Sequence, residues 1–254
     1  MDADVRLFLA EFVAAIEVAL GPNLVGIYLT GSLIAGDFEP ASSDIDFLVV
    51  TRNPVDDEEF QRLAALHAHL AAVSPWGNRL EGEYAAQRNI LPKGGTGTGA
   101  TIEPKEELKR ASLADLTAEN LLAIRQSGLT LYGPAPVCVL PAVDSGVLAA
   151  ALREYLSELR AKAETRRDAT VGEKADWLLN IARCRYGLRF GQPSSKPEAA
   201  TWMAQESPPM TRGLAAALAV RVGQSNPSAN ARLDEAFRML PSLHFEETTP
   251  PVEN

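Results

Sequence analysis

Cysteines and long hydrophobic runs are scarce in this sequence, and their scarcity excludes several classes of protein. The two cysteines, Cys138 and Cys184, lack the paired spacing of a zinc site and are too few for a disulfide framework. We therefore expect both to be buried, reduced thiols. No apolar run approaches the ~20 residues that a transmembrane helix requires, and the first four residues lack the basic charge of a signal peptide. A soluble, cytoplasmic protein is the expectation.

Positive charge is also in deficit. The chain has 24 Lys and Arg against 33 Asp and Glu, which gives a formal net charge of −9. Because affinity for nucleic acid comes largely from basic side chains on phosphates, this balance disfavours a nucleic acid partner. It favours a cationic ligand instead. We expect a small cationic molecule as the partner and a monomer or weak dimer as the state of the protein.

The most informative stretch lies between residues 24 and 50. It reads as an apolar strand over 24–30, a sharp turn at Gly31, and a second apolar strand over 45–50 that opens with Asp44 and Asp46. Side chains alternate along a strand, so the two carboxylates should leave the same face. Two carboxylates placed together can hold one hard cation such as Mg²⁺. The alternative is that they only cap and solvate the edge of a strand.

The turn between these strands has the composition of a phosphate-binding loop. Gly31 lets the backbone turn sharply and approach a ligand closely. Ser32 can start a helix whose free N–H groups would receive a phosphate. A phosphate site beside metal-binding aspartates predicts phosphoryl or nucleotidyl transfer.

A third strand is predicted over 79–84, and it carries two more acids. Glu81 and Glu83 share one face by the same alternation. In nucleotidyl transfer the attacking hydroxyl must lose a proton, and a carboxylate on a neighbouring strand can accept it. Either residue could be that general base, and either could instead be a solvated charge on a strand edge.

The remaining pattern predicts an α+β first half and an all-helical second half. Helices are expected over 4–20, from about 58 to 73, and over 116–126, with a short apolar segment over 129–132. The glycine-rich residues 92–101 lack the strand–loop–helix context of a dinucleotide fingerprint, so we expect a flexible loop, or a lid that uses Lys93. Prolines after residue 133 mark a domain boundary. We place the domains at 1–140 and 145–243, followed by a disordered tail over 244–254.

The helix expected over 173–190 has a polar stripe beside its packing face. Glu173, Asp176 and Arg183 lie on that stripe at helical spacing, although acids at a helix start also suit the helix dipole. Ser195 and Glu198 have the spacing of a capping box at the start of the next helix. Lys196 would then sit at a helix N-terminus, where its charge opposes the dipole and so suggests an anionic ligand.

Gly31-Ser32 followed by Asp44-x-Asp46 resembles the active-site signature of the polymerase-β-like nucleotidyltransferases. Leu80-Glu81 also resembles the segment that carries the general base in aminoglycoside adenylyltransferases. The resemblance implies an N-terminal nucleotidyltransferase domain and a C-terminal α-helical bundle domain. It also implies metal binding by the two aspartates, phosphate binding by Gly31, Ser32 and Ser43, and catalysis by Glu81.

The second half is similar to the helical domain of the streptomycin and spectinomycin adenylyltransferases. The similarity rests on the spacing of Arg183, Tyr186, Gly191, Lys196 and Trp202. It implies that Arg183 and Lys196 bind ATP phosphates and that Glu173 and Asp176 bind the acceptor. The implied reaction transfers AMP from Mg²⁺-ATP to a hydroxyl of an aminoglycoside antibiotic and releases pyrophosphate.

The chain departs from those enzymes in its aromatic residues. Its tryptophans are Trp76, Trp177 and Trp202, and none lies between the third strand and residue 129, where those enzymes place an aromatic residue for the drug. The acceptor is therefore left open between an aminoglycoside, another small metabolite and a protein side chain. An ATP-binding regulatory module is the non-enzymatic alternative.

Overall fold

The computed structural model describes residues 3–36, 38–39, 43–166, 168–224 and 226–240. The predicted tail over 244–254 lies outside these residues. The chain divides into two compact units, residues 1–143 and 144–254, and each is described by itself. In the described ranges, no helix combines the length and the apolar composition that crossing a bilayer requires.

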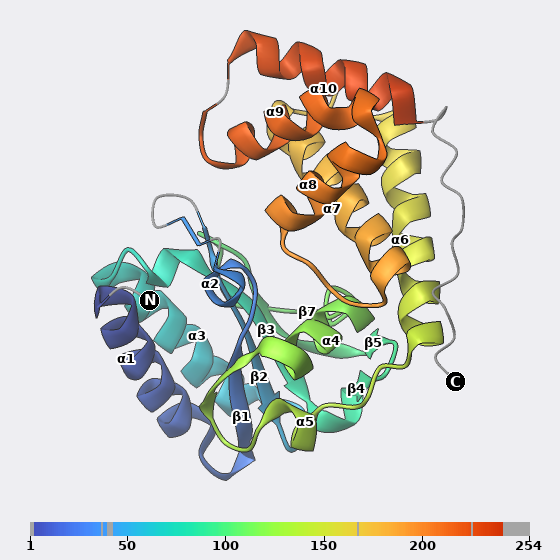
Figure 1. Cartoon of the computed structure of the whole chain (residues 1–254). Coiled ribbons are helices and arrows are strands. Elements are labelled where there is room, and N and C mark those ends of the chain that lie inside the picture. The colour runs from blue at the N-terminus through green and yellow to red at the C-terminus, as the bar shows by residue number, and fades with distance from the viewer. Residues whose placement is uncertain (1–2, 37, 40–42, 167, 225, 241–254) are drawn as a thin grey trace. The chain divides into compact units, whose positions relative to one another are not determined.

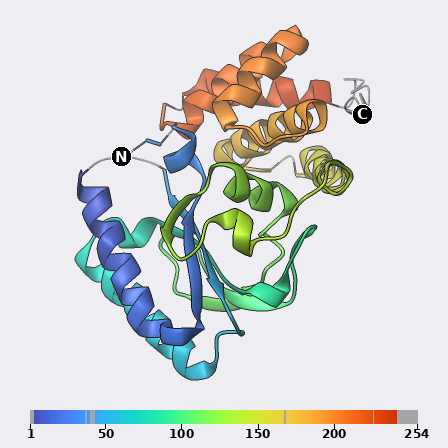
Figure 2. The same cartoon turned by 60° about the horizontal axis from the view of Figure 1, so that its bottom comes forward.

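Unit 1 is a mixed sheet covered by helices on both faces (Figures 1 and 2). Its helices are α1 (Ala3–Leu20), α2 (Ser32–Ala35), α3 (Asp57–Val73), α4 (Ala118–Ser127) and α5 (Pro136–Val139). Its strands are β1 (Leu24–Leu29), β2 (Ile45–Thr51), β3 (Leu80–Ala86), β4 (Ile90–Leu91), β5 (Gly94–Gly95), β6 (Thr98–Ile102), β7 (Lys109–Ser112) and β8 (Leu129–Tyr132). The six-stranded sheet has the order β7-β6-β3-β2-β1-β8, and β4 pairs with β5.

The pairing of β2 with β3 is parallel, and the other pairs in this sheet are antiparallel. Parallel neighbours need a crossover, and α3 supplies it. A capping box fixes the start of α3: Asp56 accepts a hydrogen bond from the N–H of Glu59, and the Glu59 carboxylate accepts one from the N–H of Asp56. β2 and β3 therefore begin at the same end of the sheet.

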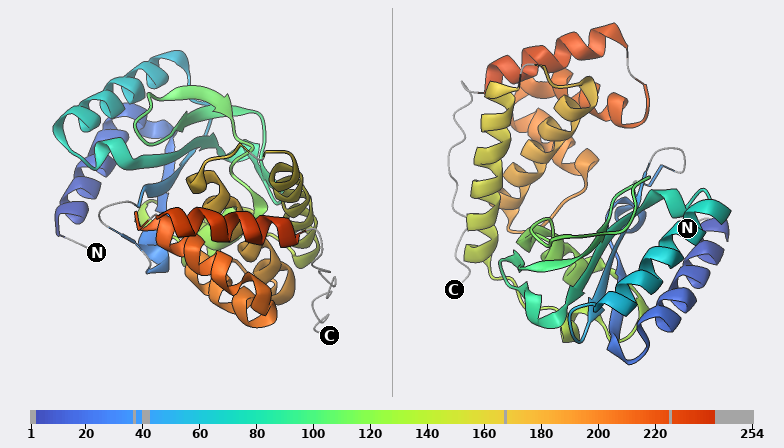
Figure 3. Two further views of the ribbon diagram at one scale, coloured as in Figure 1. Left: turned by 90° about the horizontal axis from the view of Figure 1, so that it is seen from above. Right: turned by 180° about the vertical axis from the view of Figure 1, so that it is seen from behind.

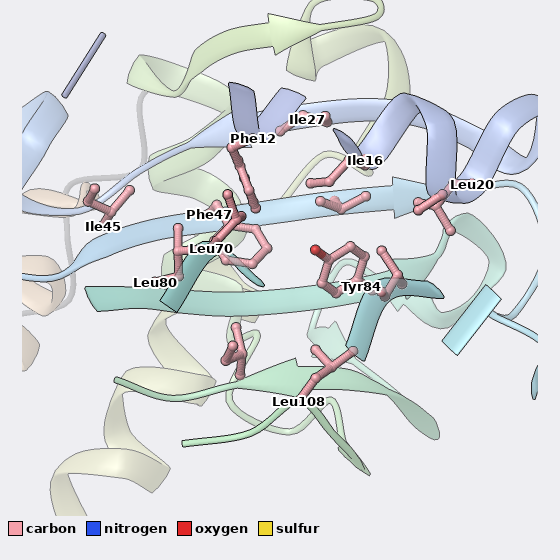
Figure 4. Packing of buried hydrophobic residues seen from close by; sticks show 14 of the residues in the cluster. Phe12, Ile16, Leu20, Ile27, Ile45, Phe47, Leu70, Leu80, Tyr84 and Leu108 are labelled. Atoms are coloured by element: carbon pink, nitrogen blue, oxygen red, sulfur yellow. The ribbon is translucent and has the colours of Figure 1, made fainter. Parts of the chain in front are cut away.

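Two apolar clusters hold unit 1 together. One fills the space between the sheet and helices α1 and α3, and Figure 4 shows Phe12, Ile16 and Leu20 of α1 directed toward Phe47 and Tyr84 of the sheet. The other lies on the opposite face beneath α4 and α5; its buried residues include Tyr28, Leu48, Val50, Ala85, Leu113 and Leu121. Because side chains alternate along β2, Leu48 and Asp46 share the second face.

The expectation of a flexible loop over 92–101 is wrong. These residues form β5 and most of β6, and β6 pairs with β3 in the main sheet. Glycine is required there because backbones approach closely: a Cβ at Gly99 would lie 2.6 Å from the carbonyl oxygen of Tyr84, and one at Gly94 would lie 2.6 Å from that of Leu116.

Unit 2 is a helical bundle built around one central helix. Its helices are α6 (Ser145–Thr165), α7 (Val171–Phe190), α8 (Lys196–Glu206), α9 (Thr211–Arg221) and α10 (Pro227–Met239). α7 contacts α6, α8, α9 and α10, and Figure 3 shows it from two sides, with α6 in yellow and α10 in red. Its buried residues consequently occur on several faces, including Leu178, Leu179, Ile181, Ala182 and Tyr186.

The predicted α+β class is confirmed, with a mixed sheet in unit 1 and helices in unit 2. The prediction of two buried thiols is half correct. Cys184 is buried on α7, whereas Cys138 is exposed on α5. That helix is only four residues long and buries Pro136 and Val139 instead.

Candidate active site

The backbone at Gly31 brings the turn after β1 against Asp46. Gly31 has φ 68° and ψ −153°, a combination that is almost restricted to glycine. A Cβ at this position would overlap the Asp46 carboxylate. The N–H of Thr30 also donates to the carbonyl of Asp46, at 3.0 Å. The turn and the carboxylate are therefore fixed relative to each other, as the sequence pattern led us to expect.

Ser32 is the first residue of α2, and Gly31 is its N-cap. The N–H groups of Ile34 and Ala35 donate to the carbonyl of Gly31, at 3.2 and 3.0 Å. The predicted helix start at Ser32 is thus present, although the helix is a single turn. The N–H groups that precede Ile34 are the ones left to meet a phosphate.

Asp46 and Glu81 are direct neighbours across the sheet. In the parallel register of β2 and β3, Asp46 lies beside Glu81 and Leu48 lies beside Glu83. Both glutamates are half-buried and share the face of Asp46, opposite α1 and α3. Asp44 precedes β2 by one residue and alternates onto the same face. The predicted carboxylates therefore meet on one face of the sheet, toward the end at which β2 and β3 begin.

Burial and crowding raise the pKa of both glutamates. Burial is the main cause for Glu81, and the charges of Asp46, Glu103 and Asp44 add to it, so that its pKa is about 8. For Glu83, burial and the charges of Asp115 and Glu103 raise the pKa to about 7. A carboxylate with such a pKa can accept a proton near neutral pH, as a general base must.

The donor set fits Mg²⁺ bound together with a nucleotide. Within the described ranges, no three His, Cys, Asp or Glu side chains are grouped closely enough to hold a metal ion alone. Mg²⁺ is usually held by one or two carboxylates, with the remaining positions filled by water and substrate phosphates. Asp44 and Asp46, carried on one face at the start of β2, supply such a pair.

Ser43 is buried and serves to close the loop before Asp44. Its hydroxyl accepts a hydrogen bond from the N–H of Glu39 at 2.9 Å, and its own N–H donates to the carbonyl of Glu39 at 2.8 Å. A hydroxyl can still donate its proton while it accepts. A phosphate contact by Ser43 therefore stays a prediction that its geometry allows.

Arg79 is a residue of this site that the sequence patterns did not indicate. Its Nη2 donates to the carbonyl oxygens of Ser43 and Glu39. The guanidinium lies over the ring of Trp76, 4.9 Å from the centroid, and 5.9 Å from that of Phe38. Arg79 thus joins the start of β3 to the loop that carries Asp44. Only its position directly before Leu80 could have drawn attention to it.

In unit 2, Glu173 forms the capping box of α7. Its Oε2 accepts hydrogen bonds from the N–H and the hydroxyl of Thr170, at 2.7 and 2.9 Å, and Arg166 lies 3.4 Å from its Oε1. The hydrogen bonds from Thr170 lower the pKa of Glu173. The structure gives Glu173 a helix-capping role, and acceptor binding by this residue stays a prediction.

Asp176 and Lys196 contact each other. Lys196 Nζ lies 2.9 Å from Asp176 Oδ1. The residue predicted to bind phosphate and a residue predicted to bind the acceptor thus form one ion pair. Lys196 is the first residue of α8, as expected. Arg183 Nε donates to the carbonyl of Ser194 at 3.1 Å, which places Arg183 beside the loop that leads to Lys196.

The predicted capping box at Ser195 is only half present. Ser195 accepts from the N–H of Glu198 at 3.2 Å. The Glu198 carboxylate does not return the bond; its Oε1 accepts from the hydroxyl of Tyr186 at 2.9 Å instead. Packing of α8 on α7 redirects that side chain.

Two family models match the chain, one in each half. A model described as "Nucleotidyltransferase domain" matches residues 15–76, and one described as "Aminoglycoside adenylyltransferase, C-terminal domain" matches residues 138–242. The first spans β1, the Gly31 turn and β2. The second spans the bundle helices of unit 2.

Individual proteins give the same result. Two curated proteins, each named aminoglycoside (3'') (9) adenylyltransferase, are similar over 227 residues; the Shigella flexneri protein is 24% identical and the Escherichia coli protein 25%. Each alignment covers 81% of this chain and 80% of the relative. Among solved structures, a spectinomycin adenyltransferase, AAD(9), from Enterococcus faecialis, determined with ATP and spectinomycin, matches with a TM-score of 0.70 at 18% identity. That match covers 93% of this chain and 99% of the other, and it supports the fold.

Proposed function

With a nucleotidyltransferase domain in its first half and an aminoglycoside adenylyltransferase C-terminal domain in its second, the chain is an enzyme of the nucleotidyltransferase type, and we propose that it transfers AMP from ATP to a hydroxyl group of an aminoglycoside-class antibiotic. Streptomycin and spectinomycin are the proposed acceptors, pyrophosphate is the second product, and resistance to the drug is the consequence. The names of the relatives and the acidic character of the site support this proposal.

Glu81 is the proposed general base. The acceptor hydroxyl gives its proton to Glu81 while its oxygen attacks the α-phosphorus, and the bond from that phosphorus to the bridging β-phosphate oxygen breaks. Asp44 and Asp46 are the proposed ligands of Mg²⁺, which on binding would supply positive charge against the phosphates. Gly31, Ser32 and Ser43 are the proposed phosphate contacts. The observation that carries the proposal is the register that places Glu81 beside Asp46 while the Gly31 turn packs on Asp46.

The proposed contributions of unit 2 concern both substrates. Arg183 and Lys196 are proposed to bind the phosphates of ATP, and Glu173 and Asp176 to bind the acceptor. Since Asp176 now holds Lys196, we propose that the triphosphate takes over Lys196 and leaves Asp176 available to a cationic acceptor. Asp176 would then lose its ion pair with Lys196 only when nucleotide is bound.

Pyrophosphate release is the test. Wild-type enzyme with Mg²⁺-ATP should release pyrophosphate when streptomycin or spectinomycin is added, and mass spectrometry should show the drug heavier by one AMP. Glu81→Gln should lower kcat by about 10²–10⁴-fold while ATP still binds, because a general base contributes that much. Glu83→Gln is the comparison on the same strand, and its kcat at saturating acceptor should change by less than about tenfold.

Different results would point to the other functions. Pyrophosphate release with a neutral metabolite or a protein, and none with either drug, would keep the reaction and change the acceptor. ATP binding without release in any mixture would indicate a regulatory module. Full activity in Glu81→Gln would remove that residue from catalysis.

A further inference from the structure

A second group of acids lies beside Glu81 on the same face of the sheet, and the proposed reaction does not use it. Glu83 on β3 lies directly opposite Thr101 on β6 in the antiparallel register. Directly opposed residues share a face, so Thr101 is directed to the side of Glu83. Glu103 lies two residues beyond Thr101 and therefore alternates back to that side. We call these three residues the β3–β6 cluster.

Among the described residues, the side-chain oxygens of this cluster have no hydrogen-bond partner in the protein. In the part of the chain that is described, neither the Glu83 nor the Glu103 carboxylate has a hydrogen bond or an ion pair to another side chain. Thr101 is 7% exposed, and its buried hydroxyl oxygen has no hydrogen-bond partner. A buried hydroxyl without a partner destabilises the fold and is rare in folded proteins. Such a group beside half-buried carboxylates indicates a ligand that the protein itself does not supply.

Lys109 compensates this cluster only in part. It lies opposite Thr101 on β7 and so on the same face, but its ammonium group lies 2.7 Å from the carboxylate of Glu106, outside the cluster. Its charge also reaches Glu103, where burial, the larger effect, still raises the pKa. Asp115 adds a further negative charge close to Glu83. Acids therefore outnumber bases around the cluster, and partial burial makes a charged Glu83 costly to leave uncompensated.

We infer that the β3–β6 cluster binds a protonated amine of the acceptor. Glu83 and Glu103 accept hydrogen bonds from its N–H groups, and the Thr101 hydroxyl oxygen accepts a further one. This inference rests on the proposed function and adds to it the place where a positive charge of the acceptor is held. A protonated amine carries two or three N–H donors and no acceptor, which matches carboxylate and hydroxyl oxygens. A metal ion fits less well, because no three acids in the described ranges are grouped to hold one.

Charge balance favours the same ligand. ATP with one Mg²⁺ keeps a net negative charge, so nucleotide binding cannot neutralise the acids around Glu81. A cationic acceptor can, because it brings positive charge to a face on which Asp44, Asp46, Glu81, Glu83 and Glu103 lie within electrostatic reach. The cluster would therefore select acceptors with an amine close to the hydroxyl that reacts.

The experiment compares charged and neutral forms of one ligand. The probes are spectinomycin and its N-acetylated derivative, in which the amines are neutral. Calorimetry measures the Kd of each for wild type, Glu83→Gln, Thr101→Val and Glu103→Gln. Glu107→Gln is the matched control, since Glu107 is an exposed acid outside the cluster. The quantity of interest is the ratio of the two Kd values, which a general loss of structure would not change selectively.

Wild type and Glu107→Gln should prefer spectinomycin over the neutral form by at least about tenfold. Glu83→Gln and Glu103→Gln should lose most of that preference, and Thr101→Val should lose part of it, while affinity for the neutral form stays within about threefold. An unchanged preference in all three cluster variants overturns the inference, as does a wild type that binds both forms equally. Thr101→Val provides a readout if a glutamate variant does not fold.

The outcomes separate this inference from the proposed function. If the wild type adenylylates only neutral polyols, nucleotidyl transfer is supported and amine binding by the β3–β6 cluster is overturned. If the wild type binds spectinomycin through the cluster but releases no pyrophosphate with it, amine binding by the β3–β6 cluster is supported and the proposed reaction is overturned.

Discussion

At the scale of single residues, two glycines on either side of α2 provide a matched comparison. Gly31 and Gly36 both have positive φ, 68° and 80°, but only a side chain at Gly31 would overlap Asp46; nothing lies within 4 Å of a Cβ at Gly36. Gly36→Ala should lose about 1–2 kcal/mol of stability, because positive φ disfavours L-residues. Gly31→Ala should lose more, because its Cβ would also overlap Asp46. Only Gly31→Ala should also lose Mg²⁺-dependent activity, by at least ~10²-fold.

Urea unfolding and pyrophosphate release measure these two effects. The Gly36→Ala variant reports the cost of the backbone conformation alone. If it loses as much activity as Gly31→Ala, the contact between Gly31 and Asp46 has no special role.

The sequence predicts the carboxylates at this scale well, and it does so for a physical reason. Alternation along a strand is local, so Asp44 and Asp46 on one face follow from spacing alone. The pairing of Asp46 with Glu81 depends on which strands become neighbours and in what register, and 35 positions separate the two residues. The hydrogen bonds of Arg79 to backbone carbonyls have no signature in spacing either.

At the scale of elements, Arg79 connects the start of β3 to the loop that carries Asp44. A prediction follows from its planar guanidinium group. Arg79→Lys keeps the charge but loses the fork that reaches the carbonyls of Ser43 and Glu39 and the flat group that stacks on Trp76. The loop before Asp44 should then hold that residue less firmly. We expect the Mg²⁺ concentration for half-maximal activity to rise about tenfold, with a smaller change in kcat at saturation.

Arg88→Lys is the control, because Arg88 is exposed and lies beyond the opposite end of β3. Equal Mg²⁺ requirements in the two variants and wild type would mean that Arg79 does not position Asp44. Trp76 fluorescence would report independently whether the stacked arrangement has changed.

The contact between α3 and β3 predicts a dependence of stability on pH. His67 of α3 is buried among Phe12 and Phe47, its Nε2 lies 2.7 Å from the hydroxyl of Tyr84, and its Nδ1 has no partner within the described residues. Burial lowers the pKa of His67 from 6.5 to about 4. Between these values the unfolded chain binds more protons than the folded one, so this contribution to stability is present above pH 6.5 and is lost as the pH falls to 4.

The loss amounts to at most about 3 kcal/mol at 1.36 kcal/mol per pKa unit. Glu81 and Glu83 act in the opposite direction, since their raised pKa values stabilise the metal-free protein as the pH falls. The comparison therefore needs His67→Leu, with His69→Leu as control because His69 is exposed on the same helix. The stability difference between wild type and His67→Leu should shrink from pH 7 to pH 4.5; a constant difference would contradict the prediction.

Element boundaries also show where sequence patterns are reliable. Amphipathic spacing predicted α1, and the helix expected over 173–190 is α7, which begins at a capping box and ends at Gly191. The strands β5 and β6 were missed because glycine normally weakens a strand. Their glycines are needed for close backbone approach, which only the folded sheet reveals.

At the scale of the whole molecule, the ion pair of Lys196 with Asp176 tests whether unit 2 binds nucleotide. If Lys196 binds ATP phosphates, Lys196→Gln should raise KM for ATP about tenfold, whereas Asp176→Asn should leave it unchanged or lower it by releasing the lysine. If the pair is only structural, both variants should have the same small effect, since exposed ion pairs contribute at most about 1 kcal/mol. Steady-state kinetics of the two single variants and the double variant decide between these results.

The parallel pairing of β2 with β3 determines which changes of chain length the enzyme can tolerate. The two strands are joined through α3, on the face opposite the acids, so residues gained or lost in the turn between Thr51 and Asp56 leave the strand register intact. Loss of one residue at the start of β3 would turn the carboxylate of Glu81 to the other face and present an apolar or glycine position to Asp46. Insertions and deletions in natural or engineered versions of this chain should therefore be found in the crossover turns and be absent from the first residues of β2 and β3.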